Sequence, residues 1–204
     1  MGPTGPFKGE NMHCPDTLKD HVIHVLKGEY SIDLKLARPV FLDIGANVGA
    51  FAVWAKHFWP HAIVHCFEPL KSNFEYLTKN TEHLTDVHLN NYAIGDTDRT
   101  KLFLGKNNCG ESSFNQIGEQ LTDYEIVTTK SPSILPKADV LKLDTEGCEV
   151  EILQSLQLDY EYIMLEYHSE ADRRKIDELL DNYILIGSSS NRRHRGVVKY
   201  LLKN

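Results

Sequence analysis

The sequence is poor in several features that define particular classes of protein. Its four cysteines are widely spaced and form no C-x-x-C pair, so neither a zinc cage nor a disulfide framework is predicted, and a reducing cytoplasm is the expected location. It has no apolar run near the length of a membrane span, and its N-terminus lacks the apolar core of a signal peptide. We therefore expect no membrane partner.

Positive charge is also scarce. The formal net charge is −7 at pH 7 and the sequence pI is ≈ 5.8. Because a nucleic-acid backbone is held by a basic face, this balance disfavours nucleic acid as the main partner. The hydrophobic fraction of 41% and the charged fraction of 25% are ordinary for a folded protein, and they exclude disorder of the whole chain.

The length and the apolar pattern indicate one folded domain. A chain of 204 residues is long enough for a large core. We expect an N-terminal arm, a helix and an extended segment within residues 1–36, followed by a single domain over 37–204. In that domain, short apolar strands alternate with helical segments, which predicts an α/β fold with a mostly parallel sheet. The expected strands lie near 40–42, 63–67, 87–90, 138–143 and 162–168, and an antiparallel hairpin is expected from 183–187 and 197–202 around a polar, arginine-rich tip.

The turn that follows the first of these strands is built from small residues. Gly45 and Gly49 enclose Ala46, Asn47 and Val48, and a helical pattern begins directly afterwards. Small residues let a ligand lie close to the backbone, while the first N–H groups of the helix remain free to bind it. A plain tight turn without a ligand is the alternative. Asn47 stands where a dinucleotide-binding turn would have another glycine, which disfavours an NAD oxidoreductase, and asparagine tolerates positive φ.

An acid closes the same strand and narrows the choice of ligand. Asp43 would repel an anionic pyrophosphate and attract a cationic ammonium group of the methionine type. We therefore predict S-adenosylmethionine as the cofactor. The residues predicted to bind it at this turn are Asp43, Gly45, Ala46, Asn47 and Gly49.

The next two strands supply the expected contacts to the adenosine part. Glu68 ends the second strand 19 residues beyond Gly49, close to the spacing of about 20 that places an acid on a ribose diol. The alternative is an exposed glutamate that favours the positive end of the helix after it. Ala93 and Ile94 follow the third strand, where we expect adenine to rest.

A second group of acids follows the later strands. Asp144 and Glu146 come after the apolar run at 138–143, and the alternation places Lys142 on the same side as Asp144. Glu166 and His168 end the strand at 162–168. In an open parallel sheet these strand ends face one crevice. The alternative is that Asp144 and Glu146 cap the helix that follows.

Three segments together resemble the FkbM family of S-adenosylmethionine-dependent methyltransferases. They are D-I-G-A-N-V-G at 43–49, F-E-P at 67–69 and K-L-D-T-E-G-C-E at 142–149, and the likeness covers about residues 29–168. The resemblance implies a Rossmann-like class I methyltransferase fold, with a seven-stranded mostly parallel sheet, helices on both faces and an antiparallel C-terminal hairpin. It also implies O-methylation of a hydroxyl on a sugar, a glycan or a related small molecule.

O-methylation of an alcohol needs a base, because a protonated hydroxyl is a poor nucleophile. We expect Glu146, Glu166 and His168 near the acceptor and Asp144 beside the methionine part of the cofactor; which group removes the proton is left open. Alternatively, Asp144, Glu166 and His168 hold a divalent cation, with magnesium compatible, that lowers the pKa of the hydroxyl.

Two other functions remain as alternatives. An RNA ribose 2′-O-methyltransferase would use Lys142, Asp144 and Glu166 as a lysine–acid site. In a non-catalytic S-adenosylmethionine-binding domain, the acids would have no catalytic role.

One residue and two segments each have two possible interpretations. Tyr30 either closes over a ligand or packs in the core, residues 107–113 are favoured as a surface loop over a pocket wall, and residues 188–196 are favoured as a solvated hairpin tip over a grip on an anionic group.

Overall fold

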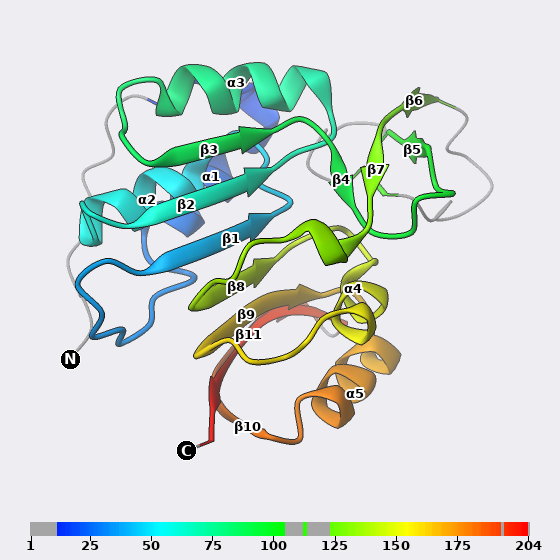
Figure 1. Ribbon diagram of the computed structural model, residues 1–204. Coiled ribbons are helices and arrows are strands. Elements are labelled where there is room, and N and C mark those ends of the chain that lie inside the picture. The colour runs from blue at the N-terminus through cyan, green and yellow to red at the C-terminus, as the bar shows by residue number, and fades with distance from the viewer. Residues whose placement is uncertain (1–11, 105–111, 114–122, 193, 204) are drawn as a thin grey trace.

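The computed structural model describes residues 12–104, 112–113, 123–192 and 194–203. Its central element is one seven-stranded sheet with the order β10-β11-β9-β8-β1-β2-β3 (Figure 1). Neighbouring strands are parallel except at β11, which is antiparallel to both β9 and β10. The predicted α/β fold with a C-terminal antiparallel hairpin is confirmed. The strands are β1 Val40–Ile44, β2 Ile63–Phe67, β3 Val87–Asn90, β8 Val140–Leu143, β9 Tyr162–Tyr167, β10 Tyr183–Arg192 and β11 Arg195–Leu202.

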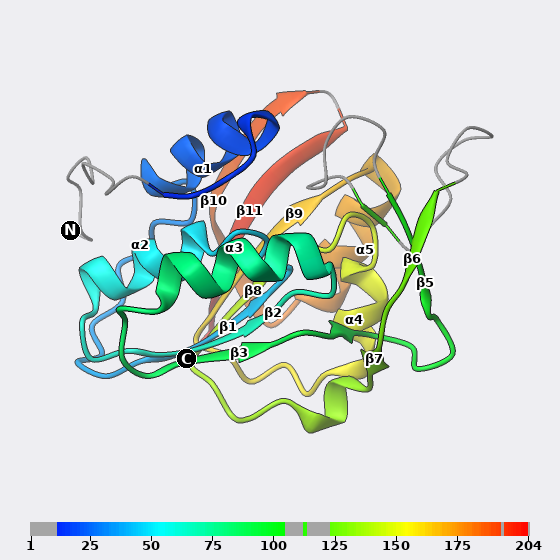
Figure 2. The same ribbon diagram turned by 90° about the horizontal axis from the view of Figure 1, so that it is seen from above.

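Helices cover both faces of this sheet (Figures 1 and 2), as the family resemblance implied. A short 3-10 turn, η1 (Asp16–Leu18), leads into α1 (Lys19–Leu26), which lies on the same face as α2 (Ala50–Phe58) and α3 (Lys71–Thr81). The other face carries α4 (Glu149–Ser155) and α5 (Glu170–Leu179). No helix in the described part of the chain combines the length and apolarity needed to cross a bilayer.

Strand alternation gives each face its own apolar core. Phe41 packs with α1 and α2, whereas its neighbour Leu42 packs with α4 and α5. On the first face, the ring of Phe51 meets the edges of Tyr30 and Phe41 at centroid distances of 5.7 and 5.9 Å. Tyr30 is 1% exposed, which confirms the interpretation of this residue as a packed aromatic. Burial of each such large side chain contributes roughly 1.5–3 kcal/mol.

Small sheets lie beyond the carboxyl ends of β1, β2 and β3 (Figure 1). β4 (Ala93–Ile94) pairs in parallel with β7 (Thr129–Lys130), and β5 (Lys101–Phe103) pairs antiparallel with β6 (Tyr124–Ile126). A further 3-10 turn, η3 (Pro132–Ile134), precedes β8. Most of the predicted surface loop at 107–113 lies outside the described residues, which include only its last two members.

The alternating segment at 29–36, expected to be an extended segment, joins no sheet. Its backbone carbonyls bind side chains instead of a neighbouring strand. Lys199 Nζ donates to the carbonyl of Ser31 at 3.0 Å, and the hydroxyl of Tyr162 donates to that of Asp33 at 3.0 Å. The alternation of apolar residues reflects packing against α2 and the sheet, which needs no strand partner.

The C-terminal hairpin has longer strands than predicted. Ser188 and Ser189 pair with Val198 and Val197, so most of the expected polar tip continues β10. A serine-rich run predicts a loop because its side chains are polar, but on an edge strand polar side chains point into solvent without interrupting the ladder. As a consequence, Arg195 begins β11 and does not lie in a solvated tip.

Candidate active site

A cavity of about 330 Å³ opens at the carboxyl ends of the parallel strands. This volume is within the range of small-molecule sites. Its wall combines turns that follow β1, β2 and β8 with the ends of β9 and of the β10–β11 hairpin. Seven of the predicted site residues line it: Gly45, Asn47, Glu68, Ile94, Asp144, Glu146 and Glu166.

The turn after β1 depends on residues without bulk. Gly45 has a φ of +82°, and a Cβ placed there would lie 1.8 Å from the carbonyl oxygen of Asp144. Asn47 has a φ of +51°, which confirms the expectation from its tolerance of positive φ. Gly49, at the start of α2, has a φ of +89°. Only Gly45 and Asn47 of this turn line the cavity; Ala46 lines a smaller neighbouring pocket.

Glu68 is buried against this turn, with an exposed fraction of 5%, so the alternative of an exposed glutamate is wrong. Its Oε2 accepts a hydrogen bond from the backbone N–H of Asn47 at 2.8 Å, and its Oε1 accepts one from the N–H of Leu70 at 2.9 Å. Burial raises its pKa to about 7. A carboxylate has about four lone-pair sites, so acceptor capacity remains on the cavity side.

Asp43 has a different role from the one predicted. Its side chain is 0% exposed, it does not line the cavity, and its Oδ1 lies 3.0 Å from Nζ of Lys142. The two residues are partners in the β1–β8 register, which brings their side chains together inside the sheet layer. Lys142 also donates to the carbonyl of Gly45 at 2.7 Å. We therefore correct the predicted direct contact of Asp43 with a ligand: its carboxylate holds Lys142, and Lys142 holds the turn.

Asp144 lies between Lys142 and the cavity. Its Oδ2 accepts a hydrogen bond from the hydroxyl of Tyr30 at 3.3 Å and lies 3.9 Å from Nζ of Lys142. Burial alone would raise its pKa, but the positive charges of Lys142, His21, His168 and Arg195 lower it to about 2. Asp144 therefore stays anionic at the cavity wall.

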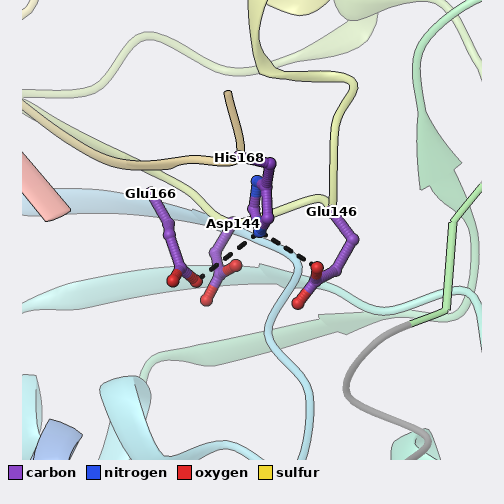
Figure 3. A group of neighbouring side chains, drawn as sticks. All are labelled: Asp144, Glu146, Glu166 and His168. Atoms are coloured by element: carbon purple, nitrogen blue, oxygen red, sulfur yellow. Dashed lines mark ion pairs between the residues drawn. The ribbon is translucent and has the colours of Figure 1, made fainter. Parts of the chain in front are cut away.

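Asp144, two glutamates and a histidine converge in one cluster (Figure 3). One potential ligand atom of each of Asp144, Glu146, Glu166 and His168 lies within 4.8 Å of the others. His168 Nε2 is 3.0 Å from Oε2 of Glu146 and 3.8 Å from Oε2 of Glu166. The structure thus brings together the group that the sequence predicted around the acceptor.

His168, however, is not a proton acceptor in this arrangement. Burial lowers its pKa, but contacts with the carboxylates of Glu146 and Glu149 outweigh this and raise it to about 11. The imidazole is therefore already protonated at neutral pH, and it does not line the cavity. We correct its predicted catalytic role: His168 positions Glu146.

The turn after β8 is strained and held by a residue for which no role was predicted. Glu146 has a φ of +53°, which costs roughly 1–3 kcal/mol for a residue other than glycine. The carboxylate of Glu149 accepts hydrogen bonds from the N–H of Thr145 at 2.8 Å and from that of Gly147 at 3.0 Å. Glu149 is 1% exposed, and its place in the third motif was the only sequence signal for it.

The capping alternative for Asp144 and Glu146 is not what the structure shows. The N-cap of α4 is Cys148, and the two acids face the cavity.

The described end of the segment at 107–113 also reaches the site. The hydroxyl of Ser113 donates a hydrogen bond to the carbonyl of Glu146 at 2.6 Å. Its neighbour Ser112 lines the cavity, so the described end of this segment contributes to the pocket wall.

Arg195 is the principal site residue that the sequence interpretation missed. Its Nη2 lies 2.7 Å from Oε1 of Glu146 and 3.0 Å from Oε2 of Glu166, and its Nε lies 2.5 Å from Oε1 of Glu166. Burial lowers its pKa, but the two carboxylates outweigh this and raise it above its usual range. Burial and the charge of Asp144 raise the pKa of Glu166 to about 7 against the opposing effect of Arg195.

The N-terminal segment from η1 to the turn after α1 also reaches the site. Leu18, His21, His24 and Glu29 line the cavity. The first three recur at intervals of three, which places them on one side of a helix, and this spacing is the signal that would have identified them. Ala93 does not line the cavity although its neighbour Ile94 does, because successive residues of a strand point to opposite sides.

Comparison with known proteins points to one family and one fold. The family model for the methyltransferase FkbM domain matches residues 43–186. Among solved structures, an FkbM methyltransferase from Methylobacillus flagellatus aligns over 85% of this chain and 46% of its own, with a TM-score of 0.57 and 13% identity. A precorrin-6y C5,15-methyltransferase from Geobacter metallireducens aligns over 100% of both chains, with a TM-score of 0.57 and 13% identity.

A third solved structure contains bound S-adenosyl-L-methionine. Fibrillarin from Aeropyrum pernix, in complex with natively bound S-adenosyl-L-methionine, aligns over 90% of this chain and 74% of its own, with a TM-score of 0.52 and 13% identity. At these identities the structures establish the fold, which is the Rossmann-like methyltransferase fold. Among curated protein sequences, no relative matches this sequence.

Proposed function

The chain belongs to the FkbM methyltransferase family, and on that premise we propose that it is an S-adenosylmethionine-dependent O-methyltransferase acting on a hydroxyl of a sugar, a glycan or a related small molecule. One observation carries the proposal. A single cavity is lined by Gly45, Asn47 and Glu68 and also by the carboxylates of Glu146 and Glu166. Two sets of groups with different chemistry thus face one space, as a transfer between two bound molecules requires.

The first set fits S-adenosylmethionine. Gly45 leaves no side chain over the turn, and Glu68 has acceptor capacity for the two hydroxyls of a ribose. Ile94 offers an apolar surface for adenine, and the anionic Asp144 suits a positively charged methionine part. The cofactor, when bound, supplies a methyl carbon on a positively charged sulfur. The chain then has to orient this group and keep it near the acceptor.

The second set suits an alcohol. Glu146 and Glu166 are carboxylates within the cavity, and either accepts the proton of the hydroxyl as its oxygen bonds to the methyl carbon and the carbon–sulfur bond breaks. The lining also includes the polar residues His21, Glu29 and Ser189, which suit a molecule with several hydroxyls. We propose that alignment of the two bound molecules supplies most of the rate enhancement.

The test is transfer of an isotope-labelled methyl group to a panel of sugars and glycans, with a structured RNA as a further acceptor. We expect label on a sugar hydroxyl, and we expect Glu166→Gln to depress turnover while Glu161→Gln does not. Glu161 is a matched control because it lies just before the opposite end of the same strand, β9. Label on RNA with a steep dependence on salt, or cofactor binding without turnover on any acceptor, would contradict the proposal.

A further inference from the structure

The cluster of Asp144, Glu146, Glu166 and His168 has the composition of a divalent metal site. Its potential ligand atoms lie within 4.8 Å of one another, and three of the residues offer carboxylate oxygens, which magnesium prefers. Whether a metal fits depends on what those oxygens already contact. Oε1 of Glu166 lies 2.5 Å from Nε of Arg195, and Oε2 of Glu146 lies 3.0 Å from Nε2 of His168.

Arg195 occupies the place of a bridging cation in this cluster. Its Nη2 contacts both Glu146 and Glu166, at 2.7 and 3.0 Å, while its Nε contacts the second oxygen of Glu166. The guanidinium thus binds one carboxylate with two nitrogens and links it to the other carboxylate, a geometry that the planar fork favours and a lysine ammonium does not reproduce. A divalent ion would have to displace it.

The charges of the cluster are likewise supplied by the chain. Asp144 lies 3.9 Å from Lys142, Glu146 contacts His168 and Arg195, and Glu166 contacts Arg195. Each carboxylate therefore already has a cationic partner. Adding a metal without removing Arg195 would bring like charges together in a partly buried site.

The backbone fixes Arg195 in this place. It is the first residue of β11, and the next residue, Gly196, pairs with Tyr167 of β9. A Cβ on Gly196 would lie 2.3 Å from the carbonyl oxygen of Ser189, so the absence of a side chain lets the two strands of the hairpin close beside the site. The side chain of Arg195 then reaches Glu166 across the β9–β11 pair.

From this arrangement we propose that Arg195 is a positioning residue that takes the place of a divalent metal ion, holding Glu146 and Glu166 together so that methyl transfer needs no metal. The inference rests on the proposed function for its kinetic part only. It also replaces the sequence-based expectation of magnesium at Asp144, Glu166 and His168, because the donor set does not fit a metal while Arg195 is present.

The experiment compares the wild type with Arg195→Met, Arg195→Lys and the control Arg173→Ala. Arg173 is also paired with a carboxylate, that of Asp177, but on α5 and outside the cavity wall. Manganese binding is measured by electron paramagnetic resonance on the cofactor-free proteins. Turnover is measured with chelator and with added magnesium or manganese, alongside the affinity for S-adenosylhomocysteine.

We expect the wild type and Arg173→Ala to bind no manganese at this cluster and to keep their turnover in chelator. Arg195→Met should lose about 100-fold in kcat with its S-adenosylhomocysteine affinity within about twofold, acquire saturable manganese binding, and recover part of its turnover with the metal. Arg195→Lys should fall between them, because an ammonium is a point charge and not a fork.

Two results would overturn the inference: loss of wild-type turnover in chelator with recovery in magnesium, or an Arg195→Met protein that folds but acquires no manganese affinity. If Arg195→Met does not fold, Arg195→Lys decides, and wild-type kcat in that variant also counts against the inference. If neither the wild type nor any variant methylates an acceptor, the proposed function fails. The measurement of manganese binding then still tests the role of Arg195 by itself.

Discussion

Glu68 combines burial, acceptor capacity and contact with the turn after β1 in one side chain. Its two oxygens bind the N–H groups of Asn47 and Leu70 and so tie the end of β2 to that turn. Because burial raises its pKa to about 7, the free protein holds a mixture of protonated and anionic Glu68 near neutral pH. The protonated form has lost acceptor capacity on one oxygen, so the ionisation matters for ligand binding.

This gives a pH dependence with a definite sign. A ribose diol binds the anion better, so below the pKa of about 7 binding must first remove a proton, and above it no such cost exists. The affinity for S-adenosylhomocysteine should therefore rise with pH by up to about tenfold per unit below 7 and level off above it. Calorimetric titrations at a series of pH values between about 5.5 and 8.5 measure this pH dependence of the affinity.

Glu68→Gln cannot ionise and should abolish the slope, whereas Glu75→Gln, at an exposed position on α3, should preserve it. A slope that persists in Glu68→Gln would assign the pH dependence to another group.

Glu149 is the second residue whose environment decides its role. Its carboxylate accepts two N–H groups and the hydroxyl of Thr145, and it thereby holds Glu146 at positive φ. In Glu149→Gln an NH2 group replaces one of the two carboxylate oxygens, and the negative charge is lost. We therefore expect the protein to be destabilised by about 2–3 kcal/mol and its turnover to be reduced.

Denaturant unfolding measures the change in the free energy of unfolding. Glu151→Gln is the control, because that glutamate lies on the same helix, is exposed, and should change stability by no more than about 0.5 kcal/mol. Equal stability of the two variants would show that Glu149 does not hold the turn.

The crossing of the turn after β1 over the end of β8 sets the shape of the site. Gly45 lies so close to Asp144 that any side chain would meet a backbone carbonyl, and neither backbone can move without shifting a central strand. Lys142 supports the same crossing from the other side through its bond to the carbonyl of Gly45.

Gly45→Ala should therefore destabilise the protein by about 3 kcal/mol or more, because the change adds a clash to an unfavourable φ. Gly187→Ala is the matched control: its Cβ would find its nearest neighbour at 3.5 Å, an ordinary contact with a lysine side chain. Thermal unfolding of both variants measures the difference, and a Gly45→Ala protein as stable as Gly187→Ala would contradict the close crossing.

The elements differ in how far the sequence predicted them. The strand, turn and helix around Gly45 were predictable because local preferences and apolar period agree there, and Asn47 signalled the positive φ directly. The segment at 29–36 alternates like a strand, yet its carbonyls are satisfied by Lys199 and Tyr162 from distant parts of the chain. Local pattern cannot reveal such partners.

The site forms where segments that are far apart in the sequence meet. The topology of a parallel sheet brings the ends of β1, β2, β8 and β9 to one edge, which made Glu68, Asp144, Glu146 and Glu166 predictable as a group. Arg195 was not predictable in this way, because its place depends on the register of β11 against β9. The same holds for His21, which reaches the cavity because α1 packs on the core with α2.

We propose that one cavity holds the cofactor at Glu68 and a separate acceptor at Glu166. This is tested by measuring the affinity for S-adenosylhomocysteine of the wild type, Glu68→Ala and Glu166→Gln. All three affinities are determined by calorimetry in the same buffer at the same pH. We expect at least about tenfold weaker binding for Glu68→Ala and a change within about twofold for Glu166→Gln. Equal losses in the two variants, or no loss in either, would contradict it.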